Sequence, residues 1–300
     1  MLELVLPLYL YVILGIIAGR FLRIESQPIA RLTIYLLTPI IIGGYVAQVP
    51  FEPALLALPL AVFTVAGIVA FVAWGVIGAI PSIRPYRTLL GASGGMLNSG
   101  YFGISIAGAV LGADQVGTYM LAIFGLTLFE YIIGAYLINR HVASPKESFK
   151  RLIRLPGLYA CLSGLLISGL DIQIPSIALT TLSTLKSAYV VLGMMMLGLV
   201  LSQRRFSLNL PFICAAFIIR FGVWFAATAL LLLLDRATLG VLSPPISQTI
   251  LWLMGFLPIG ANVIAYAVDA EASPEQIAPA VVLSTLLSPV LISFSVAIHP

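Results

Sequence analysis

The chain has 300 residues, of which 61% are hydrophobic and only 9% are charged. Soluble domains carry about 25% charged residues, so too few charges are present here to cover a water-exposed surface. The formal net charge of +4 is small and scattered, which argues against a nucleic-acid-binding surface. Because the apolar residues lie in long blocks, we predict an all-α polytopic membrane protein whose partner is the lipid bilayer.

The apolar blocks set the number of membrane spans, since a spanning helix needs roughly 20 predominantly apolar residues. Read in chain order, the interruptions leave ten predicted spans: 4–22, 28–48, 54–80, 88–112, 116–138, 156–170, 176–202, 209–234, 246–268 and 276–298. The first span has no basic residue before it and no small-residue cleavage site after it. We therefore expect a retained helix and not a signal peptide.

Basic residues gather in alternate connections, and positively charged loops stay on the cytoplasmic side. The first, third, fifth and seventh connections hold most of them: Arg20, Arg23, Arg31, Arg84, Arg87, Arg140, Lys146, Lys150, Arg151, Arg154, Arg204 and Arg205. This distribution predicts that both termini lie on the outer side of a cell (inner or plasma) membrane. The ninth connection, with Asp269, Glu271 and Glu275, is acidic and is expected on the cytoplasmic side as an exception.

The basic connection 140–155 divides the chain into two sets of five spans, 1–139 and 156–300. Because five is odd, the two halves are predicted to lie in opposite orientations. A short pattern recurs at corresponding places: Leu6-Pro7 with Gly15, and Leu155-Pro156 with Gly164. Inverted five-helix halves are a recurrent plan of secondary transporters, with the substrate near the midplane where broken helices from each half meet.

Two spans in corresponding positions contain predicted breaks. Residues 91–105 are too rich in glycine and polar side chains for a lipid-facing span, and Pro258 with Gly260 interrupts the ninth span. Freed backbone groups cannot face hydrocarbon, so the breaks should line a protein-enclosed or watered cavity. The N-termini of half-helices suit an anionic group. The alternative is that these small residues only allow close helix packing.

The breaks supply the candidate substrate-binding residues: Asn98, Ser99, Gly100, Ser105, Pro258, Gly260 and Asn262. The two asparagine amides offer both donors and acceptors, which match a carboxylate or a coordinated sodium ion. A hydrogen bond between helices is the alternative use of either asparagine.

Three ionisable residues lie at mid-depth, where each costs about 2.5 to 3.5 kcal/mol on insertion scales. Glu130 is a candidate proton carrier or a structural ion-pair partner of Arg220. Lys186 is a candidate charge partner of the substrate, or it extends to the membrane interface. Arg220 is, with Glu130, a candidate coupling or charge-lock residue, although a structural role is favoured for it. Together they leave a local excess of positive charge, which suits an anionic substrate.

The sequence holds no His-Glu-x-x-His, Gly-x-Ser-x-Gly or P-loop motif, so we expect no enzyme and no ATP hydrolysis. The two cysteines, Cys161 and Cys214, lie far apart inside apolar blocks and form neither a disulfide framework nor a zinc site. No cofactor or metal is expected. An ion gradient or the gradient of the substrate itself must then drive transport.

At the fourth span the sequence begins to resemble a known family. Asn98-x-Gly100-Tyr101-Phe102-Gly103 is similar to the Asn-x-Gly-aromatic-x-Gly-x-Pro signature of the auxin efflux carrier family. The segments 35–39, 197–199, 257–267 and 278–288 are also similar to patterns of this family, and they follow one another in the same order. In two places the chain departs from the family: Ser105 stands where proline is usual, and the span around Lys186 lacks the usual proline.

The resemblance implies a scaffold of spans 1, 2, 6 and 7, often dimeric, and a moving transport domain of spans 3–5 and 8–10. The family moves organic anions by an elevator-like or rocking motion. For this chain it implies a secondary or facilitative transporter, an exporter of small carboxylates, with proton or sodium coupling and a homodimer through the scaffold. The alternatives are a sodium-coupled symporter of the bile-acid type, a non-transporting receptor or sensor, and a channel.

Overall fold

The computed structural model describes residues 2–50, 52–139, 152–202 and 207–298, together with Lys146 and Lys150. Its α-helices are α1 (Leu2–Phe21), α2 (Ser26–Leu32), α3 (Thr38–Val46), α4 (Ala57–Gly78), α5 (Arg87–Gly95), α6 (Ile104–Val110), α7 (Val116–Phe129), α8 (Ala135–Asn139), α10 (Pro156–Gly169), α11 (Ser176–Ser202), α12 (Leu210–Phe217), α13 (Trp224–Ala237), α14 (Pro245–Phe256), α15 (Asn262–Asp269) and α16 (Pro274–Ile298). Within the described part of the chain there is no β-strand. The predicted all-α class is confirmed.

Within the described ranges, six continuous helical segments are long and apolar enough to cross a membrane: Ser26–Val46, Ala54–Gly78, Ala113–Ile138, Ser176–Ser202, Leu210–Ala237 and Pro274–Ser293. Shorter apolar helices cover Leu6–Phe21, Ser99–Val110 and Pro156–Gly169. Large apolar side chains point outward from many of these helices, for example Leu6, Leu166 and Leu233. Such an apolar exterior is compatible with a polytopic membrane protein and suits a lipid environment.

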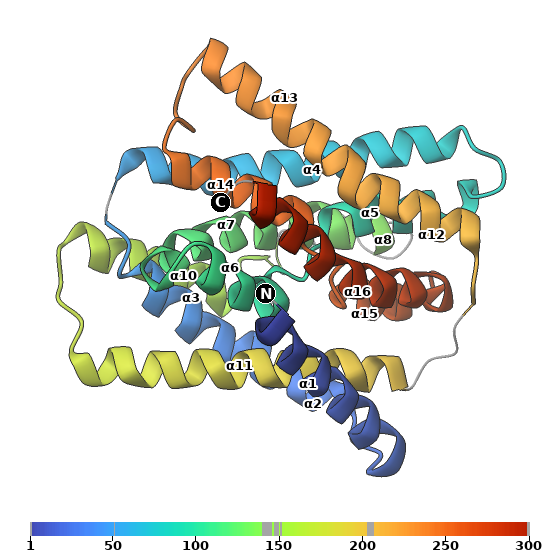
Figure 1. Cartoon of the computed structure of the whole chain (residues 1–300), viewed down its shortest axis with the longest axis horizontal. Helices are drawn as coiled ribbons and strands as arrows, with labels where there is room; N and C mark the ends of the chain where they lie inside the picture. Colours follow the sequence, from blue (N-terminus) through green and yellow to red (C-terminus); the bar gives the residue numbers. More distant parts are fainter. Residues whose placement is uncertain are drawn as a thin grey trace.

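The helix α1 packs along α11, and α10 packs along α3 (Figure 1). Glycines bring the backbones of both pairs very close together. Along α1 and α11, a Cβ on Gly15 would collide with the carbonyl of Met195, and one on Gly198 would collide with the carbonyl of Val12. Along α10 and α3, a Cβ on Gly164 would lie 2.6 Å from the carbonyl oxygen of Gly43. Gly15 and Gly164, which the sequence pattern paired, therefore have the same packing role.

The remaining helices form a second group. The long helix α4 packs against α5, α7 and α13, and α16 contacts α12, α14 and α15. Val62, Val65, Ala66 and Val69 of α4 are fully buried, because β-branched and small side chains let neighbouring helices approach. This group encloses both predicted breaks.

Both breaks are present. The helix α5 ends at Gly95, and the chain becomes helical again at Ser99; likewise α14 ends at Phe256 and α15 begins at Asn262. The two interrupted stretches meet in an isolated antiparallel β-bridge between Leu97 and Ile259. Segments far apart in the sequence thus cross at their non-helical parts.

Four helices widen to π-helix for about one turn: η1 (Thr33–Leu37), η4 (Ser99–Gly103), η6 (Glu130–Gly134) and η7 (Ile218–Val223). Single π-turns inside helices are frequent at functional sites. Three of the four contain candidate residues from the sequence, namely Ser99 and Gly100, Glu130 and Arg220.

Most of the basic connection 140–155 lies outside the described residues. Arg204 and Arg205 of the seventh connection also lie outside them.

Candidate functional site

The crossing of the two interrupted stretches is held by a reciprocal pair of backbone hydrogen bonds. The N–H of Asn98 donates to the carbonyl of Pro258 over 3.0 Å, and the N–H of Gly260 donates to the carbonyl of Met96 over 2.8 Å. A Cβ on Gly260 would lie 2.9 Å from the carbonyl oxygen of Leu97, so only glycine fits there. The freed backbone groups therefore satisfy one another, as they must in a water-poor interior.

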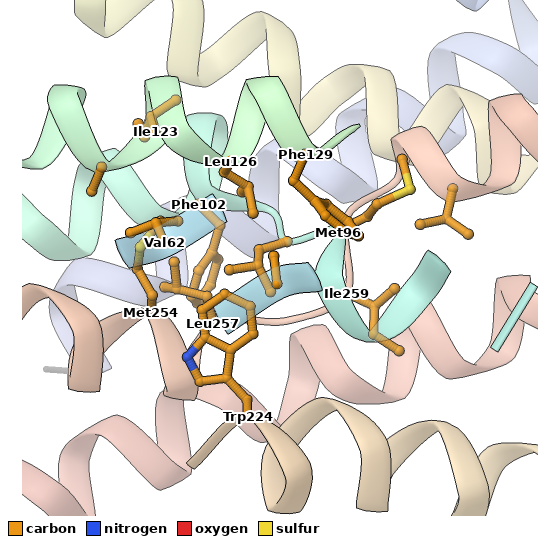
Figure 2. Packing of buried hydrophobic residues seen from close by; sticks show 14 of the residues in the cluster. Val62, Met96, Phe102, Ile123, Leu126, Phe129, Trp224, Met254, Leu257 and Ile259 are labelled. Carbon is orange, nitrogen blue, oxygen red and sulfur yellow. The ribbon is translucent and has the colours of Figure 1, made fainter. Parts of the chain in front are cut away.

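Apolar side chains surround the crossing. Met96, Leu257 and Ile259 are fully buried, and Figure 2 shows them beside Phe102, Phe129 and Trp224. Water is excluded from such a cluster, so each polar group inside needs a protein partner or a ligand.

Asn98 is only 4% exposed and caps the π-turn η4. Its Oδ1 accepts a hydrogen bond of 3.2 Å from the N–H of Phe102, which fixes which end of the amide is the oxygen. The Nδ2 group on the other end is buried and has no hydrogen-bond partner among the described residues. An unsatisfied buried donor costs about 1 to 3 kcal/mol, so this position suits a ligand that supplies an acceptor oxygen.

The residues that follow Asn98 contact neighbouring helices. The carbonyl of Ser99 accepts a 3.0 Å hydrogen bond from the hydroxyl of Tyr119. A Cβ on Gly100 would lie 2.7 Å from the hydroxyl oxygen of Tyr189, so glycine is required for this approach. Ser105 donates to the carbonyl of Tyr101 over 3.4 Å, within helical structure that continues from η4 into α6 without a second break. The helix therefore continues through Ser105.

The other half-helix, α15, begins beside a carboxylate. Asn262 stands at its first position, and its Nδ2 donates to Oε2 of Glu130 over 3.4 Å. Glu130 itself is buried, with 8% of its surface exposed. A negative group at a helix N-terminus interacts favourably with the helix dipole. The N-terminal end of α15 therefore already faces an acidic side chain.

Arg220 lies at the opposite end of the same break and is fully buried. Its Nε donates to the carbonyl of Leu257 over 2.9 Å, and its Nη2 donates to the carbonyl of Met254. The guanidinium carbon lies 4.7 Å from the centroid of the Trp224 ring. A cation bound to terminal carbonyls complements the negative end of a helix. Arg220 therefore caps the C-terminal end of α14.

Glu130 and Arg220, both within the described part of the chain, do not form the ion pair considered from the sequence. Glu130 binds the Asn262 amide, and Arg220 binds backbone carbonyls. The physical reason is that each charge already meets a helix end of opposite polarity. Glu130 lies at the N-terminal end of α15, and Arg220 lies at the C-terminal end of α14. The Nη1 group of Arg220 is buried and has no hydrogen-bond partner in the described part of the chain.

Lys186 lies away from the breaks. Its Nζ is 5.3 Å from the centroid of the ring of Tyr45, near the C-terminal end of α3, and the Lys186 side chain is half-buried. The structure thus groups Asn98, Gly100, Pro258, Gly260 and Asn262 at one crossing, whereas Lys186 stands against Tyr45. On α11 it is about one helical turn from Tyr189, the residue that does reach Gly100.

A set of hydroxyl side chains at the crossing was missed by the sequence reasoning. The Tyr101 and Tyr189 rings lie 4.8 Å apart. Tyr101 donates to Oγ1 of Thr33 over 3.3 Å, and Thr38 donates to the Tyr189 hydroxyl over 3.4 Å. Ser284 of α16 accepts a 3.1 Å hydrogen bond from the N–H of Ile259. Tyrosine in apolar segments usually indicates packing, so no sequence signal marked this cluster.

Within the described residues, no group of histidine, cysteine, aspartate or glutamate side chains could hold a metal ion. Cys161 and Cys214 are both free thiols. The polar chemistry of the crossing is therefore that of amides, hydroxyls, one carboxyl and one guanidinium.

Compared with models of known protein families and with curated proteins, the sequence matches none.

Proposed function

We propose that this chain is a secondary transporter of small organic anions, with the carboxylate of its substrate bound at the crossing of α5–η4 and α14–α15. The observation that carries the proposal is the buried, unpartnered Nδ2 donor of Asn98 at the N-terminal end of η4. A donor requires an acceptor, and a carboxylate oxygen supplies one where a cation does not. The partial positive charge of the half-helix N-terminus adds to the attraction.

The helix pairings support ten spans arranged as two inverted repeats, 1–139 and 156–300. In such an arrangement α1 corresponds to α10, and α3 corresponds to part of α11. A two-fold axis would then exchange the α1–α11 contact with the α10–α3 contact, and both contacts are built on glycine against backbone carbonyl. The same axis would exchange the two hydrogen bonds of the bridge at Leu97 and Ile259.

The scaffold of the proposed transporter comprises the segments 2–21, 26–46, 156–169 and 176–202, and a second copy would join it there as a homodimer. The other helices form the transport domain. Their mutual boundary contains Tyr101 of η4 and Tyr189 of α11, whose ring centroids lie 4.8 Å apart, and the Tyr101 hydroxyl donates across it to Oγ1 of Thr33. Sliding of the transport domain along this boundary would be an elevator motion in a cell membrane. Lys186 lies on the scaffold side, away from the crossing. Its positive charge would attract the anion toward the scaffold from a distance.

The proposal is tested by thermal stabilisation of the purified protein with acetate, lactate, malonate and malate, at two pH values and in sodium or potassium. At least one of the four anions is expected to raise the midpoint of unfolding in a saturable way. A stabilisation that needs sodium at fixed pH would favour the bile-acid type of symporter instead.

Uptake or exchange in proteoliposomes then tests the site. Asn98→Ala is expected to abolish transport of the stabilising anion without lowering the folded yield, because it removes both the ligand donor and the cap of η4. Unchanged transport would remove Asn98 from the site. Saturable binding without any counterflow would identify a receptor, and currents too large for a carrier cycle would identify a channel.

A further inference from the structure

The two half-helix N-termini at the crossing are not equivalent. The end of η4 carries the free Nδ2 donor of Asn98, whereas the end of α15 already holds the carboxyl of Glu130 through Asn262. The two ends belong to stretches joined directly by the Leu97–Ile259 bridge. A substrate carboxylate at Asn98 and the Glu130 carboxyl would therefore share one buried site.

We propose that Glu130 takes up one proton when the substrate carboxylate binds at the crossing, so that a proton accompanies each anion through the membrane. This inference rests on the proposed anion site. Two carboxylates that share a buried site cannot both stay ionised, so one of them becomes protonated. The substrate leaves that site in each cycle, and Glu130 remains, so the exchangeable proton belongs to Glu130.

Among the described residues, the groups around the Glu130 carboxyl carry no competing charge. The groups that face its carboxyl are the Asn262 amide of α15, Tyr131 on its own π-turn, Tyr101 of η4 and Tyr189 of α11. All of these are neutral in the physiological range. Arg220 is engaged with the carbonyls at the end of α14. Within the described residues, no cation pairs with Glu130 to hold it ionised when a second carboxylate arrives.

The proton balance is simple. The empty site holds an ionised Glu130. It takes up one substrate monoanion and one proton from the same side of the membrane, and Glu130 is neutral in the resulting complex. Release on the other side returns the anion and the proton to solution. Because linkage is reciprocal, a lower pH raises anion affinity, and bound anion raises the affinity of Glu130 for its proton. The cycle moves no net charge for a monocarboxylate.

The test is proton uptake by the purified full-length protein in weakly buffered detergent solution, on addition of acetate, lactate, malonate or malate, from about pH 5 to about pH 9. For an anion that stabilises the protein, uptake is expected to rise toward about one proton per protein at the pH where free Glu130 is ionised. Glu130→Gln is expected to take up none, and the affinity of this variant for the anion should not change with pH. In proteoliposomes it should lose accumulation driven by a pH gradient.

Two further variants make the test decisive. Glu130→Asp keeps a titratable group and should retain proton uptake, whereas Asp114→Asn, which changes an exposed acid outside the crossing, should behave as the unchanged protein does. Proton uptake that persists in a folded Glu130→Gln variant, or that is absent from the unchanged protein despite anion binding, overturns the inference. If none of the four anions stabilises the protein, the proposed function itself fails first, and this inference falls with it.

Discussion

The N–H of Gly260 donates to the carbonyl oxygen of Met96 over 2.8 Å, and this bond joins two helices at the points where each is interrupted. The position accepts only glycine, since a Cβ there would lie 2.9 Å from the carbonyl oxygen of Leu97. A substitution as small as alanine therefore tests whether the bridge holds the two breaks together.

Gly260→Ala is expected to destabilise the protein by about 1 to 3 kcal/mol, because a methyl group is forced against backbone that cannot move without breaking the bridge. The measurement is the midpoint of thermal unfolding in detergent. Gly75→Ala is the matched control: no atom lies within 4 Å of its Cβ position on α4, so it should be neutral or stabilise by about 0.5 to 1 kcal/mol. Equal effects of the two changes would contradict the tight crossing.

Gly15→Ala and Gly164→Ala are expected to destabilise to a similar extent, by about 1 to 3 kcal/mol each. In both, a methyl group would meet a backbone carbonyl of the neighbouring helix, α11 or α3. Gly157→Ala, with open space at its Cβ position on the same helix as Gly164, should leave the unfolding midpoint nearly unchanged. A large effect of one of the two substitutions and none of the other would argue against equivalent packing in the two halves.

Arg220→Met is expected to lower stability by about 3 kcal/mol, because it removes the hydrogen bonds from a buried cation to the carbonyls of Leu257 and Met254. Arg220→Lys keeps the charge but has no planar fork to reach both carbonyls, so we expect an intermediate loss. The exposed Arg236, which donates a long hydrogen bond to Gln248, supplies the control: Arg236→Met should change stability by less than about 0.5 kcal/mol. A neutral Arg220→Met would rule out the proposed cap on α14.

Tyr189→Phe removes the hydroxyl that meets Thr38 and approaches Gly100. Because the hydrogen bond is long, the expected loss of stability is small, about 0.5 to 1.5 kcal/mol. The rate of anion exchange in proteoliposomes should change more than the binding affinity does, since the group lies on the boundary across which the transport domain would slide. An altered affinity with an unaltered rate would instead place the hydroxyl among the substrate contacts.

Both termini are expected on the outer side, because the basic residues concentrate in the odd connections. Alkaline phosphatase fused after residue 300 should therefore be active in bacterial cells, and a fusion at residue 145 should be inactive. The opposite pattern of activity would reverse the orientation in the membrane.

Local sequence was enough for much of the fold. The helix bounds follow the apolar blocks closely: the predicted span 176–202 coincides with α11, and the predicted 156–170 matches α10 within one residue. The breaks at 91–105 and at Pro258–Gly260 were also predictable, because proline and clustered glycine weaken helical hydrogen bonding wherever they occur. The number of helices that cross the membrane stays a prediction, with six long enough to do so.

The partners of the buried charges could not be predicted in this way. Depth along a helix placed Glu130, Lys186 and Arg220 at similar levels, and opposite signs favoured a pair between Glu130 and Arg220. The contacts of a side chain depend on how its helix is rotated about its axis and on which helices pack beside it. The spacing of residues along one helix determines neither. Arg220 instead meets the carbonyl end of α14, Glu130 meets Asn262, and Lys186 meets Tyr45.

The sequence by itself determined that the protein is helical and apolar, where its helices are interrupted, and which few polar residues lie inside them. Those properties depend on composition and on backbone preferences, which act over a few residues. Only the tertiary structure decided that the two breaks join through Leu97 and Ile259, and that the Nδ2 donor of Asn98 is left without a partner. Both depend on hydrogen bonds between segments far apart in the chain, which exist only once the helices are packed.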